Sequence, residues 1–120
     1  MRKFTEEERR EQKQQINQLY EKFYEANNYK RIRQVLDCDP GSKEVNGLVQ
    51  SEEAEFTDYL NFFEFVAFLA ESGQLTAQQV DTLFSYYLKN LKKHAPVQDY
   101  VNDQRKGFEK LRKLLGSTRI

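Results

Sequence analysis

Apolar residues recur every three or four positions over much of the chain, a spacing that predicts amphipathic helices. The strongest pattern lies in residues 52–72, which hold five of the nine phenylalanines. The predicted apolar stripe consists of Phe56, Tyr59, Leu60, Phe63, Val66, Ala67 and Ala70, widened by Phe62, Phe65 and Leu69. A helix that is apolar over most of its circumference needs neighbours on several sides. We therefore expect this helix, with Ser51 as its N-cap, at the centre of the fold.

A second helix is predicted to follow it after a short turn and to run to about Leu91. Gly73 suits the left-handed residue that ends a helix. Thr76 and Gln79 have the spacing of a capping box, with Leu75 placed to pack on the first turns. Residues 52–91 are therefore expected to form an antiparallel helical hairpin.

Two helices are predicted before this hairpin. The first begins at Thr5, with Glu8 as its capping-box partner, and runs to about Asn27. Its first turns are polar, so residues 1–15 are expected to project or fray. A short helix capped by Asn27 or Asn28 is expected to stop near residue 37.

Residues 37–51 are predicted to form a loop, because Pro40-Gly41 and Asn46-Gly47 are successive turn signals. Val45, Leu48 and Val49 could attach this loop to the core as a single helical turn.

A last helix is predicted from Pro96 to about Leu115, weakened in its middle by Gly107 and ended by Gly116. Residues 117–120 are expected to form a loose tail. The 120 residues contain few Gly and Pro, so the pattern predicts a single all-α domain, residues 1–120, built as a bundle of four to five helices around the hairpin.

The sequence predicts a cytoplasmic protein without a membrane segment. The longest near-apolar run, residues 60–70, is interrupted by Asn61 and Glu64 and is too short to span a bilayer. The polar start has no apolar signal-peptide core. The single cysteine, Cys38, agrees with a reducing compartment.

Charge is distributed unevenly although the formal net charge is zero: both ends are basic and the middle is acidic. One explanation is that the terminal helices pack beside the acidic segment, so that the charges offset each other within the molecule. The other is a basic face for nucleic acid. The candidate residues for such a face are Lys89, Lys92, Lys93, Arg105, Lys106, Lys110, Arg112 and Lys113.

The sequence offers few residues that could bind a metal ion or take part in catalysis. Residues 37–42 resemble the opening of a calcium loop, but Ser42 and Leu48 stand where the full loop needs Gly and Glu. One histidine, His94, supplies no zinc or di-metal motif. We therefore expect no metal, no cofactor, no catalytic residue and no enzymatic activity; an enzyme would require Glu64 and His94 to converge in a cleft.

Two polar or aromatic sets remain as candidate sites. Asn61 and Glu64 lie three residues apart in the most apolar stretch, where a carboxylate must be paired. They are expected to form a polar clasp, with Glu64 bonded to a tyrosine or a basic residue of another helix, or else to line a groove. Tyrosines 86, 87 and 100 are candidates for binding a protein partner, as Tyr86 and Tyr87 cannot both be equally buried.

Residues 59–91 resemble a group of uncharacterised bacterial and phage domains. The shared features are a helix with an L-N-x-x-E sequence, a glycine turn and a helix with an L-F-x-x-Y sequence. The matching residues are Leu60, Asn61, Glu64, Gly73, Leu75, Val80, Leu83, Phe84 and Tyr87. Many such domains follow a membrane helix, whereas this chain has a charged helix there. The resemblance implies a helical fold and a bacterial or phage origin, and it supplies no activity.

The sequence thus predicts a non-catalytic module that binds a protein partner or itself. The alternative is an accessory nucleic-acid-binding protein that uses the basic C-terminal helix face.

Overall fold

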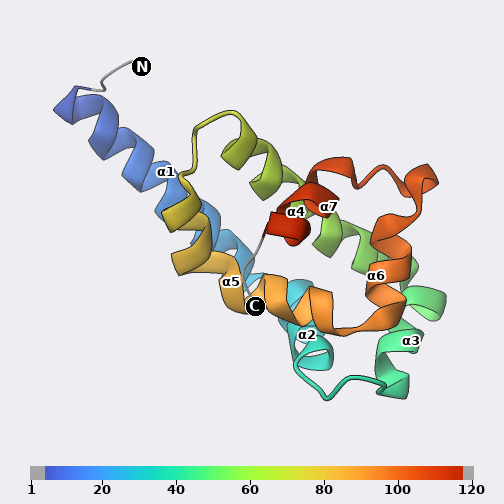
Figure 1. Ribbon diagram of the computed structural model, residues 1–120. Helices are drawn as coiled ribbons and strands as arrows, with labels where there is room; N and C mark the ends of the chain where they lie inside the picture. Colours follow the sequence, from blue (N-terminus) through green and yellow to red (C-terminus); the bar gives the residue numbers. More distant parts are fainter. Residues whose placement is uncertain (1–4, 118–120) are drawn as a thin grey trace.

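The computed structural model describes residues 5–117, and this part of the chain is helical without strands (Figure 1). The elements are α1 (Glu6–Glu25), α2 (Asn27–Leu36), α3 (Lys43–Ser51), α4 (Glu53–Glu71), α5 (Ala77–Lys93), α6 (Ala95–Asn102), the 3-10 helix η1 (Gln104–Lys106) and α7 (Glu109–Ser117). The predicted all-α class is confirmed. Within residues 5–117, no helix combines the length and the apolar character that crossing a bilayer requires.

Helix α4 lies at the centre, as its sequence predicts. It packs against α2, α3, α5 and α7, and most extensively against α7. Phe56, Tyr59, Leu60, Phe63, Val66 and Ala67 are its buried residues. The core around it is rich in aromatic rings, and the ring of Phe23 in α1 lies 4.7 Å from that of Phe62 and 5.2 Å from that of Phe63. Packing on neighbours at several sides accounts for a helix that is apolar over most of its circumference.

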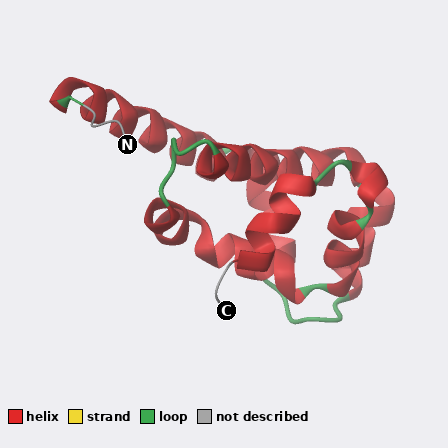
Figure 2. Cartoon of the chain, turned by 45° about the horizontal axis from the view of Figure 1, so that its top comes forward, coloured by secondary structure: helices red, strands yellow, loops and turns green. Residues whose placement is uncertain are grey.

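Helix α1 projects beyond the rest of the molecule at its N-terminal end (Figures 1 and 2). The molecule measures 49 × 28 × 25 Å. The predicted capping box is confirmed: the Glu8 amide donates to Thr5 Oγ1 over 3.1 Å, and the Thr5 amide donates to the Glu8 carboxylate over 3.3 Å. At the other end of α1, Arg33 donates to the carbonyls of Phe23 and Tyr24, each over 2.9 Å. Each end of this helix is therefore satisfied by a side chain.

The turn between α4 and α5 also follows the prediction. Gly73 has a φ of 83°. The amide of Gln74 donates back to the Leu69 carbonyl over 2.9 Å, which closes the last turn of α4. Thr76 and Gln79 then form the predicted capping box at the start of α5. The chain therefore reverses within a few residues.

Two predicted N-caps are wrong. Ala26 precedes α2 in place of Asn27, and Glu52 precedes α4 in place of Ser51, in both cases without a capping side-chain hydrogen bond. Ser51 is the last residue of α3, so a single residue separates α3 from α4. The preference of Asn and Ser for caps is a weak local signal, and here the surrounding packing decides the boundary.

The prediction of a loop at residues 37–51 is wrong for most of this range, because residues 43–51 form α3. The Ser42 hydroxyl accepts from the Glu44 amide and caps the helix. Val45 and Leu48 are fully buried, and their burial stabilises a helix that contains the expected turn Asn46-Gly47. Only residues 37–42 connect α2 to α3.

The prediction of a single last helix is also wrong, since the helix is interrupted between α6 and α7. Asp103 caps η1 by accepting from the Arg105 amide, and Gly107 then adopts a left-handed φ of 81°. Gly116 does not end α7, which continues to Ser117. Ser117 of the predicted loose tail is thus helical, and residues 118–120 lie outside the described part. With α3 and this break, the described residues hold seven α-helices in place of four or five.

Candidate functional site

An open groove of about 820 Å³ lies between α4, α5 and α7. Ala67, Ala70, Val80, Leu88 and Leu114 give it an apolar floor, and polar or charged side chains surround this floor. The remaining lining residues are Glu71, Ala77, Gln78, Asp81, Ser85, Lys110 and Lys113. The groove is the best candidate site because it combines apolar surface with a charged border.

The tight turn after α4 places two walls of the groove. Gly73 and the Thr76 capping box bring the first turn of α5 back beside the last turn of α4. Along α5 the lining runs from Ala77 to Leu88, a separation of eleven positions that spans about 16 Å of helix. The small side chains of Ala67 and Ala70 on α4 leave space between α5 and α7 for the groove.

The third wall, α7, is attached to α4 by Glu64. A carboxylate oxygen of Glu64 accepts from the backbone amide of Leu111 over 2.7 Å. Leu111 is the third residue of α7, and the amides of a first turn lack partners within their own helix. Glu64 therefore acts as an N-cap supplied by another helix. Phe108, the residue before α7, has an apolar side chain and cannot do this.

The predicted polar clasp is thus only half present. Glu64 is partly buried and bonded, but to a backbone amide in place of a tyrosine or basic side chain. Asn61 is exposed, and it shares a face of α4 with Phe65 and Phe68. Phe65, expected to widen the buried stripe, is 48% exposed, and Phe68 is 44% exposed, with ring centroids 6.3 Å apart. These two rings form a second exposed apolar surface.

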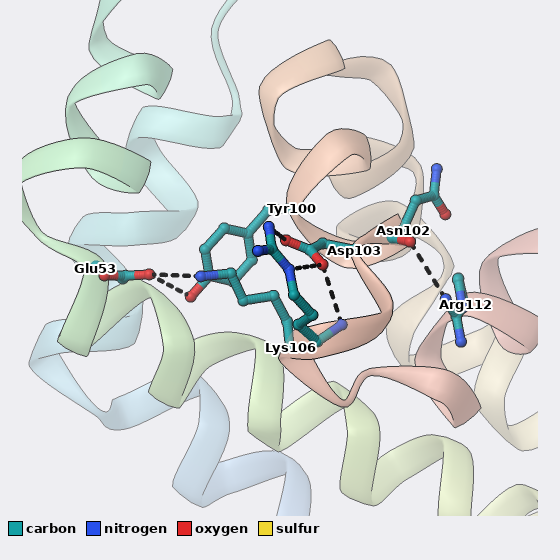
Figure 3. A network of polar contacts seen from close by, with 7 residues as sticks. Glu53, Tyr100, Asn102, Asp103, Lys106 and Arg112 are labelled. Carbon is teal, nitrogen blue, oxygen red and sulfur yellow. Dashed lines mark hydrogen bonds and ion pairs between the residues drawn. The ribbon is translucent and has the colours of Figure 1, made fainter.

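Of the candidate tyrosines, Tyr100 is buried in a polar network (Figure 3). Its hydroxyl lies 2.9 Å from the Glu53 carboxylate and 3.0 Å from Thr57 Oγ1. Lys106 Nζ lies 3.3 Å from the same carboxylate and 4.8 Å from the Tyr100 ring centroid. The Tyr100 hydrogen bond and the Lys106 charge together hold the pKa of Glu53 below its ordinary value. Tyr100 joins α6 to α4 and presents little surface to a partner.

Tyr86 and Tyr87 differ in exposure, as their adjacent positions require. Tyr86 is 56% exposed, and its hydroxyl donates to the Asp37 carboxylate. Tyr87 is partly buried, with its ring 5.0 Å from that of Phe23, and burial raises its pKa to about 12. Of the three tyrosines, Tyr86 offers most surface to a partner.

The candidate basic residues are largely engaged with acceptors within the chain. Lys106 pairs with Glu53, Lys110 with Glu71 over 3.0 Å, and Arg105 with Asp103 over 3.1 Å. Lys113 lies 3.8 Å from Glu109, and Arg112 donates to the Asn102 carbonyl over 3.3 Å. Lys89 is exposed on α5, and Lys92 and Lys93 are partly buried. Phosphate groups would have to compete with these carboxylates.

His94 is fully buried between α5 and α6. Its Nε2 lies 2.8 Å from the Leu36 carbonyl oxygen, and Nδ1 has no hydrogen-bond partner among the described residues. Nε2 therefore donates, and the ring joins the end of α2 to the end of α5. Cys38 is partly buried and reduced. Within residues 5–117, no three His, Cys, Asp or Glu side chains form a group that could hold a metal ion.

The groove was not predicted as a site, and of its lining residues only Lys110 and Lys113 were among the candidates, for binding nucleic acid. Ala67, Ala70 and Asp81 are ordinary residues of amphipathic helices, and only the packing of α5 and α7 against α4 brings the lining residues together. A search of protein-family models, of curated proteins and of solved structures finds no match to the chain.

Proposed function

We propose that the protein is a non-catalytic binding module that holds a helix of a protein partner in the groove between α4, α5 and α7. The single observation that carries this proposal is the groove itself, with its apolar floor and charged border. Grooves of this kind accept the apolar face of an amphipathic helix, whose side chains at three- and four-residue spacing fill the floor. The expected cytoplasmic location and bacterial or phage origin belong to the same proposal.

The shape of the groove favours a protein helix over a small molecule. Small-molecule pockets enclose most of the ligand and place a few polar groups around it. This groove is open along about three turns of α5, and its charged residues stand at its borders. A helix can use the whole length, while a small ligand would stay exposed to water.

Nucleic acid binding is the alternative, and the pairing of its candidate residues weighs against it. Lys106, Lys110 and Arg105 each contact a carboxylate of this chain. Exposed ion pairs are weak, so phosphates could displace some of them, but each displacement leaves a carboxylate beside the phosphate.

The proposal is tested with a displayed library of amphipathic helical peptides, selected for binding to the full chain. Two tryptophan variants of α5 then locate the site. Ala77→Trp places a large side chain in the groove, and Thr82→Trp is the matched control, because Thr82 is exposed on α5 outside the groove lining. We expect selected peptides to bind the Thr82→Trp variant normally and the Ala77→Trp variant about tenfold more weakly. Circular dichroism checks that both variants are folded.

Two outcomes contradict the proposal. One is a set of selected peptides that bind the Ala77→Trp variant as tightly as the unchanged protein. The other is tight binding of a labelled single-stranded oligonucleotide that weakens steeply with salt, which would favour the nucleic-acid alternative.

A further inference from the structure

The α5 and α7 walls of the groove carry opposite charges. The α5 wall contributes the carboxylate of Asp81, and the α7 wall contributes the ammonium groups of Lys110 and Lys113. Asp81 and Lys113 are exposed residues, so both charges are accessible to a bound molecule. The groove therefore has an acidic residue on its α5 side and basic residues on its α7 side.

Of the two lysines, Lys113 is the more accessible to a partner, because its ion pair within the chain is longer and more exposed. Lys110 is held by Glu71, which contributes to one end of the lining. Lys113 pairs with Glu109 at 3.8 Å, and both side chains are 71% exposed. An exposed pair between neighbouring turns of one helix contributes little, so a carboxylate on a bound helix can share Lys113 at small cost.

From this arrangement, and resting on the proposed function, we propose that the partner is an amphipathic helix with opposite charges on its two edges. Its apolar stripe lies on the alanine-rich floor. Basic residues on one edge face Asp81, and acidic residues on the other edge face Lys110 and Lys113. Complementary charges of this kind select the partner and fix its placement more than they raise its affinity.

The charge pattern also fixes the direction of the bound helix. Turning a helix end for end in a groove, with its apolar stripe still on the floor, exchanges its two edges between the walls. A helix with one basic and one acidic edge thus fits the walls in one direction only. A helix with like charges on both edges has no preferred direction and meets one repulsive wall.

The test uses stapled amphipathic peptides of about 12 residues, long enough to cover the three turns of α5 that line the groove. Three peptides share one leucine stripe and differ at their edges: one basic and one acidic edge, two basic edges, or two acidic edges. Stapling holds each peptide helical, because helices of this length are marginal in water. We expect the mixed-edge peptide to bind the unchanged protein about fivefold more tightly than either of the others.

A spin label on the N-terminus of the mixed-edge peptide reports its direction. In the unchanged protein it should broaden amide resonances near one end of the groove only, either at Ala77 or at Leu88. The double variant Asp81→Lys/Lys113→Glu places a basic residue on the α5 wall and an acidic residue at the exposed position of the α7 wall, while Lys110 stays paired with Glu71. We expect it to bind the mixed-edge peptide with similar affinity and with the broadening moved to the other end.

The outcomes separate this inference from the proposed function. Equal binding of all three peptides, or no change of direction in the double variant, overturns the charge inference and leaves the groove as a helix site. Failure of all peptides to bind, together with failure of the library selection, overturns both. A dimer of the free protein that the Ala77→Trp change dissociates would identify a second copy as the occupant and overturn the proposed partner.

Discussion

Phe23 is the residue that ties the projecting α1 to the body of the molecule. Its fully buried ring meets rings from α4 and α5, and its backbone carbonyl accepts from Arg33. The Arg33 guanidinium also lies 5.0 Å from the centre of the Phe23 ring. One residue thus joins an aromatic cluster to the end of a helix, and a long polar helix is held through its last turns.

Glu64 provides a direct test of how α7 is held. Glu64→Ala removes the acceptor of the Leu111 amide, and we expect the free energy of unfolding to fall by about 1–2 kcal/mol. Glu64→Gln keeps an oxygen acceptor and should cost less than half as much. Urea denaturation of the three proteins measures the difference. Equal losses in both variants would mean that the carboxylate charge, and not the hydrogen bond, stabilises α7.

At the scale of elements, two glycines are predicted to respond in opposite directions to alanine. Gly107 has a left-handed φ of 81°, so Gly107→Ala should lower the free energy of unfolding by about 1 kcal/mol. Gly47 lies inside α3 with open space around its Cα, so Gly47→Ala should raise it by about 0.5–1 kcal/mol. Thermal unfolding followed by circular dichroism measures both. A stabilised Gly107→Ala variant would contradict the left-handed conformation of Gly107 between α6 and α7.

The sequence predicts the elements whose boundaries depend on neighbouring residues. The capping boxes at Thr5 and Thr76 and the glycine turn at Gly73 were found because every partner lies within a few positions. Helix α3 was missed because buried Val45 and Leu48 outweigh its local turn signal. At Gly107 the sequence predicted only a weakening of the last helix, and not its interruption.

The contacts of the candidate site were harder to predict from the sequence than the helix boundaries. The cap from Glu64 to Leu111 spans 47 positions, and the bond from Tyr100 to Glu53 also spans 47. Each of these side chains has several possible partners in the sequence, and only the packing of the helices selects one. The groove has the same origin, since its three walls are separate helices.

At the scale of the whole molecule, the uneven charge along the chain is partly offset within the fold. Arg31 from α2 contacts Glu52 and Glu55 at the start of α4, and Lys110 from α7 contacts Glu71 at its end. Basic segments from both sides of the sequence thus lie along the acidic central helix, as the intramolecular explanation of the charge pattern predicts.

Buried tyrosines make the molecule sensitive to alkali. Burial raises the pKa of Tyr59 and of Tyr29, and it raises the pKa of Tyr87 to about 12. The folded state therefore keeps these protons at pH values above 10, where the unfolded chain loses them, and stability must fall as the pH rises from about 10. We expect the melting temperature to fall from that pH onward, and Tyr87→Phe to reduce the slope. An unchanged slope would show that Tyr87 ionises without cost in the folded state.

The cap that Glu64 supplies to α7 has a consequence for how the protein folds. Helix α7 has nine residues, too few to be stable alone, and its first turn gains this acceptor only after α4 is in place. We therefore expect the α7 wall to form only after α4 is in place. A helix bound in the groove would contact this wall directly, so binding should slow hydrogen exchange most in α7 and couple the formation of this wall to the presence of the partner.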